Sequence, residues 1–107
     1  MDNTFSNVKA VGINTWSSYP YVGGLQQCRV SSGLFKVSGY TTVSDCNNLA
    51  TALTVRPVSV AVDGNNMQSY TGGIFWNCGT NLSLPLLLVG MTDSYWTLKN
   101  SMGTTWG

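Results

Sequence analysis

The chain of 107 residues contains no histidine and no glutamate. Histidine is the side chain whose ordinary pKa lies nearest neutral pH, so its absence removes the commonest general acid and base. Charged residues make up only 8% of the chain, whereas a typical soluble domain carries about 25%. Uncharged polar residues must therefore cover the surface, or a partner must bury part of it.

The few charges that are present nearly cancel, with five basic against four acidic residues and a net charge of +1. No run of Lys or Arg occurs, so nothing predicts binding to nucleic acid. The longest apolar run, Leu84 to Val89, is far too short to span a membrane, and residues 1–15 lack the pattern of a signal peptide. We expect no transmembrane segment, and any targeting information to lie outside these residues.

Cysteines are also few and widely separated: Cys28, Cys46 and Cys78. Without a Cys-x-x-Cys pair or a histidine, a zinc site is not expected, and no cofactor is predicted. An odd number leaves at least one thiol unpaired or paired with another chain.

The length allows one domain, and hydrophobic periodicity predicts its elements. Asp45 is a good N-cap for a helix, and Pro57 lies just beyond its expected end. Alternation of apolar and polar residues predicts strands, and Thr92-Asp93-Ser94 separates the last two as in a hairpin. The predicted helices are 2–11 and 46–54, and the predicted strands are 34–43, 58–62, 74–76, 84–91 and 95–99. The fold class is therefore α+β with a mainly antiparallel sheet.

Five segments then carry a family resemblance. They are, in chain order, Ser18-Tyr19-Pro20-Tyr21, Arg56 to Asp63, Tyr70 to Phe75, Leu87 to Gly90 and Lys99-Asn100-Ser101. Their order and spacing resemble the papain and cathepsin L family of cysteine peptidases, and residues 1–5 add to the likeness. The resemblance implies a single partial domain, in which 1–18 is the end of the left-half helix and its crossover. Residues 19–107 then correspond to the β-barrel-like right-hand half, and the fold is incomplete.

The resemblance also implies where a catalytic site would lie. Asn100 matches the asparagine that orients the catalytic histidine, whereas Leu84 occupies the position of that histidine. An isobutyl group can neither accept nor donate a proton. Met102 stands where the family has a tryptophan that shields the site, and Pro85 replaces a small residue beside the histidine. The nucleophilic cysteine belongs to the left half, which this chain does not match.

Other features admit two interpretations. Ala61, Leu82 and Pro85 resemble the wall of the pocket for the residue that precedes the cleaved one, or serve packing alone. Cys28 and Cys78 match family cysteines whose partners are missing here; they are buried thiols or bridge to another chain. Asn81-Leu82-Ser83 has the pattern of a glycosylation site, which also arises by chance.

The sequence thus predicts a non-catalytic papain-like homologue, a pseudoprotease that acts as a structural or interaction subunit with a protein partner or larger assembly. The alternative is a fragment of an active endopeptidase whose cysteine-bearing half lies elsewhere, and an inhibitor or decoy is a third hypothesis. The family resemblance suggests a lysosomal, vacuolar or secreted location.

Overall fold

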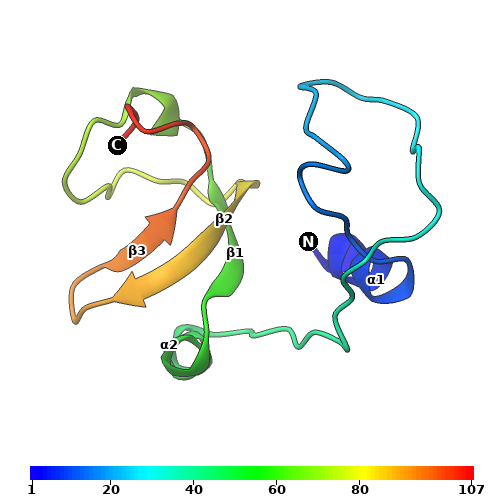
Figure 1. The fold of residues 1–107 in the computed structure, drawn as a ribbon. Helices are drawn as coiled ribbons and strands as arrows, with labels where there is room; N and C mark the ends of the chain where they lie inside the picture. The colour runs from blue at the N-terminus through cyan, green and yellow to red at the C-terminus, as the bar shows by residue number, and fades with distance from the viewer. The chain divides into compact units, whose positions relative to one another are not determined.

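The computed structural model describes residues 1–107, which form two compact units, Met1–Thr42 and Val43–Gly107. The first unit holds helix α1 and a long irregular segment, and the second holds helix α2 and the sheet (Figure 1). The elements are α1 Asp2–Ala10, α2 Cys46–Val55, β1 Val58–Asp63, the 3₁₀ turn Met67–Ser69, β2 Leu82–Met91 and β3 Trp96–Lys99. None of the helices is long and apolar enough to cross a membrane.

In the first unit, α1 confirms the predicted N-terminal helix. Phe5 and Val8 are half-buried on one face, and Phe5 stacks on Tyr40 with ring centroids 5.6 Å apart. Gly12 ends the helix with φ +101°, a left-handed conformation that glycine adopts without steric cost.

The predicted strand 34–43 is wrong. Phe35 alone forms an isolated antiparallel bridge with Ile13, through two backbone hydrogen bonds of 2.8 and 3.0 Å. Alternation of apolar side chains is insufficient for a strand, because its backbone groups also need a partner along their length. The segment after Phe35 finds none.

In the second unit, α2 begins where the sequence predicts. The Asp45 side chain accepts a hydrogen bond of 2.9 Å from the Asn48 backbone N–H. That bond, aided by the side-chain amide of Asn48, holds the pKa of Asp45 below its usual value of 3.8 against the opposing effect of desolvation. The helix packs against β1 and β2 through its half-buried apolar residues Leu49, Ala50, Ala52 and Leu53.

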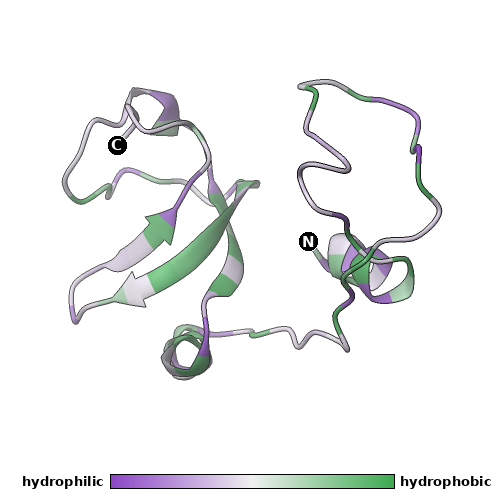
Figure 2. Ribbon diagram, viewed as in Figure 1, coloured by the Kyte–Doolittle hydropathy of each residue, from purple (hydrophilic) through white to green (hydrophobic).

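The three strands form an antiparallel sheet in the order β1-β2-β3. The core lies on the face of β2 that carries Leu86 and Leu88, the latter only 1% exposed. Val60 pairs with Leu86 and Leu98 pairs with Leu88 on the same face. β2 is hydrophobic along most of its length (Figure 2), which suits the central strand of a sheet.

Two further expectations need correction. The sheet is open, because β1 and β3 pair only with β2, so the term barrel-like is too strong. Residues 74–76 form no strand; Phe75 instead packs edge-on against Tyr70, with ring centroids 5.9 Å apart. The glycines before this segment have positive φ, +144° at Gly72 and +79° at Gly73, which turn the chain away from an extended path.

Candidate functional site

The pairing of β1 with β2 brings together residues that the sequence singled out. Ala61 lies directly opposite Pro85, and Val62 lies directly opposite Leu84. Since neighbouring residues in a strand point to opposite faces, the first pair and the second pair occupy different faces of the sheet. Leu84 shares the core face with Leu86.

A β-bulge brings the third pocket-like residue to the same side as the other two. Asp63 pairs with Leu82 rather than with Ser83, so β2 carries one extra residue at this point. This extra residue reverses the alternation, and Leu82 therefore lies on the side of Ala61 and Pro85. Leu82 is 69% exposed, so the small apolar surface that these three residues share is open to solvent.

Leu84 is half-buried beside the turn that follows β1. A Cβ added at Gly64 would lie 2.9 Å from the Leu84 Cβ, so the turn passes directly over this side chain. The position offers only hydrocarbon to its surroundings. No proton transfer can therefore take place at this residue.

Asn100 directly follows β3 and is half-buried. Its Oδ1 accepts a hydrogen bond of 2.7 Å from the Ser101 backbone N–H, while its Nδ2 is buried without a partner. Lys99 pairs with Leu87 as the last pair of β2 and β3, so Asn100 lies one residue beyond the end of that pairing. Met102, in the segment after β3, is exposed. The amide oxygen keeps a second lone pair, but the chain has no imidazole to donate to it.

Sequence reasoning missed a buried carboxylate at the end of β1. Asp63 is 5% exposed, and its Oδ1 accepts a hydrogen bond of 2.9 Å from the Asn65 N–H. Its Oδ2 would contact a Cβ at Gly79. The adjacent Gly64 N–H donates to Ser83 Oγ at 3.2 Å. Asp-Gly-Asn is a turn pattern, and the carboxylate closes that turn.

An aromatic cluster links the last residues to the middle of the second unit. The Trp106 ring lies 5.3 Å from that of Tyr70, and its Nε1–H donates to the Met67 carbonyl at 2.8 Å. Trp106 therefore packs within the second unit. Trp76, in contrast, is 83% exposed.

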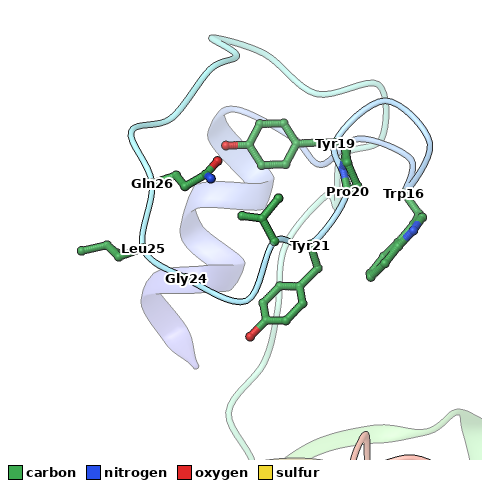
Figure 3. A pocket seen from close by; sticks show the side chains of 8 residues that line it. Trp16, Tyr19, Pro20, Tyr21, Gly24, Leu25 and Gln26 are labelled. Atoms are coloured by element: carbon green, nitrogen blue, oxygen red, sulfur yellow. The ribbon is translucent and has the colours of Figure 1, made fainter.

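The first unit has a separate shallow hollow of about 320 Å³ (Figure 3). Its lining comes entirely from residues 16–26, including Trp16, Tyr19 and Tyr21. Arg29 lies over the Tyr19 ring, 5.2 Å from its centroid, an arrangement that favours a cation–π interaction. None of the predicted site residues lines this hollow.

The three cysteines are all free and exposed. The interpretation of Cys28 and Cys78 as buried thiols is therefore wrong. Bridging of either residue to another chain stays a prediction.

The two helices and the three-stranded antiparallel sheet place the chain in the α+β class. The sequence profile of the papain family cysteine proteases matches residues 1–107. The chain belongs to this family.

Individual relatives agree with the family assignment. The chain is 37% identical over 110 residues to "Cathepsin L 2" of Paramecium tetraurelia, and 40% identical over 119 residues to "Senescence-specific cysteine protease SAG39" of Oryza sativa subsp. indica. It is 37% identical over 121 residues to "Vignain" of Ricinus communis. Each comparison covers 100% of this chain but only 34–35% of the relative. The chain thus spans about a third of the length of the curated relatives it matches.

Proposed function

We propose that this chain is a non-catalytic member of the papain family, a pseudoprotease that acts by binding as a structural or interaction subunit. The observation that carries the proposal is Leu84 at the family position of the catalytic histidine. Because the chain contains no histidine at all, it cannot supply the imidazole base.

The surroundings of Leu84 agree with this proposal. The side chain is half-buried on the core face, where the Gly64 turn packs over it, so leucine serves the packing of this position. Asn100 uses its Oδ1 to accept the N–H of its own neighbour, Ser101. This local hydrogen bond would stabilise the backbone after β3, so it gives Asn100 a structural role that needs no histidine.

A role in binding is supported by the exposed apolar side chains of the second unit. Ile74, Trp76 and Leu82 are all more than half exposed, whereas only Met67, Leu86 and Leu88 are buried hydrophobic residues. Contiguous exposed apolar groups commonly mark interaction surfaces. Leu82 lies on the side of the sheet that holds Ala61 and Pro85.

A second candidate function is proteolysis. The chain would then be a fragment of an active cysteine endopeptidase whose cysteine-bearing half lies elsewhere. It is supported by the similarity to papain family proteases along the whole chain. Under this alternative the nucleophilic thiol and the base come from outside these 107 residues, either from another polypeptide or from further residues of the same one.

Reconstitution with a separate polypeptide tests whether this chain can complete a catalytic site. The chain is mixed with the cysteine-bearing half of a papain family protease, and native mass spectrometry establishes that a complex has formed. Hydrolysis of a fluorogenic peptide and labelling by a thiol-reactive active-site probe are then measured on that complex. Leu84→His tests the critical position, and Leu87→His, also in β2, is the matched control.

We expect the wild-type complex and the Leu87→His complex to hydrolyse nothing and to remain unlabelled. Leu84→His puts an imidazole at the position that the resemblance assigns to the catalytic histidine, so measurable hydrolysis is expected from that complex alone. Hydrolysis by the wild-type complex would contradict the pseudoprotease and support the endopeptidase.

A further inference from the structure

We propose that Asn81 accepts an N-linked glycan when the chain passes through the secretory pathway. Asn81-Leu82-Ser83 has the required pattern, an asparagine followed two residues later by a hydroxyl residue, with no proline between. It is the only such triplet in the chain. The inference does not depend on the proposed function.

The structure places this triplet where a large modification can be accommodated. Asn81 lies just before β2, and the register with β1 ends at the pair of Asp63 and Leu82. Asn81, Leu82 and Ser83 are all exposed. A sugar on Asn81 would therefore displace neither a strand partner nor a core side chain.

The local backbone also presents the asparagine in a turn. The Ser83 N–H donates to the Asn81 carbonyl at 2.8 Å, which bends the chain at Leu82. The Ser83 hydroxyl accepts from the Gly64 N–H at 3.2 Å and keeps its own hydrogen free to donate. Asn77, in the same loop, is likewise exposed but has Gly79 two residues later, so it lacks the hydroxyl.

The reaction needs an oligosaccharide linked to a lipid diphosphate as the donor and an oligosaccharyltransferase as the catalyst. A bond forms between Asn81 Nδ2 and the anomeric carbon of the first sugar, and the amide nitrogen loses one proton. The bond from that carbon to the diphosphate oxygen breaks, and the lipid diphosphate leaves with the electron pair. The attached sugar adds polar surface next to Leu82 on a protein that has few charges.

The test uses the full chain behind a cleavable signal peptide, translated in the presence of microsomes from endoplasmic reticulum. The translocated fraction is defined by signal removal and protease protection, and the readout is confined to that fraction. We expect one species whose mobility shift is reversed by endoglycosidase. Release by peptide N-glycosidase in heavy-oxygen water should convert residue 81 to labelled aspartate, located by mass spectrometry.

Four variants determine whether the sugar is on Asn81. Asn81→Gln and Ser83→Ala should lose the shift, whereas Ser83→Thr keeps the hydroxyl and should retain it. Asn77→Gln is the matched control and should also retain it. A translocated wild-type chain without sugar would overturn the proposal, and so would a shift that persists in Asn81→Gln.

Discussion

At the scale of single residues, the proposal of a non-catalytic role rests on two positions, Leu84 in β2 and Asn100 after β3. Leu84 offers only hydrocarbon at the position that the resemblance assigns to the family's histidine, and Asn100 carries an amide whose buried Nδ2 has no partner. An unpaired buried donor costs about 1–3 kcal/mol. The hydrogen bond that Asn100 Oδ1 accepts from the Ser101 N–H offsets part of this cost.

The free energy of unfolding should depend on pH through Asp45, the N-cap of α2. Hydrogen bonds from Asn48 favour its ionised form and lower its pKa. Because the pKa of Asp45 is lowered in the folded state, its carboxylate contributes fully to stability above the unfolded-state pKa of 3.8. That contribution is lost as the pH falls through the folded-state pKa. Protonation should thus weaken the cap only in acid.

The comparison that tests this is Asp45→Asn, which keeps a capping oxygen but does not titrate. Urea unfolding, followed by circular dichroism, is measured for both proteins from neutral pH to below 3.8. The wild-type protein should lose stability relative to the variant only in the acid range. An identical acid loss in both would show that the cap charge has no role, since Asp2, Asp63 and Asp93 are common to both proteins.

At the scale of elements, β2 organises the second unit because both other strands pair with it. Bulges interrupt both pairings, one between Val62 and Asp63 and one between Leu88 and Gly90. The first bulge determines which side of the sheet Leu82 occupies. Such bulges commonly re-aim a side chain beside a functional surface.

Leu88 is the position where β2 should be most sensitive. Its side chain is 1% exposed and lies between Val58 on β1 and Leu98 on β3. Leu88→Ala should lower the free energy of unfolding by about 2–5 kcal/mol, because it leaves a cavity among these strands.

Val89 is the matched control, since it is the next residue of the same strand and is 42% exposed. Val89→Ala should change the free energy of unfolding by less than about 1 kcal/mol. Urea denaturation measures both variants. Similar losses in the two would mean that the core does not lie on the Leu88 face.

At the scale of the whole molecule, exposed apolar side chains greatly outnumber buried ones. Only Met67, Leu86 and Leu88 are buried hydrophobic residues, while large apolar residues are exposed in both units. A net charge of +1 provides almost no electrostatic repulsion between copies. The proposed role as an interaction subunit would cover this surface.

We therefore expect the protein to copurify with another chain from its native source, and the isolated chain to self-associate at neutral pH. Sedimentation velocity over a concentration series measures the self-association. Trp76→Ser should reduce it by removing an exposed apolar ring, whereas Ser69→Ala in the same unit is the control. A stable, monodisperse monomer at all concentrations would contradict the expectation.

The sequence alone determined the family, both helices, the Asp45 cap and the β2–β3 hairpin. These features depend on local chemistry: capping residues, periodicity and turn residues act within a few positions of the chain. The assignment of Leu84 to the family's histidine position rests on the order of motifs and stays a prediction. The contacts that each of these residues makes came only from the structure.

Only the tertiary structure decided which segments find a partner strand. Phe35 has a single bridge and residues 74–76 have no strand partner, although both segments carry the side chains of strands. The bulge that places Leu82 beside Ala61 and Pro85 likewise arises from pairing with β1. Backbone pairing joins residues far apart in the chain, so its register depends on packing that local side-chain patterns do not encode.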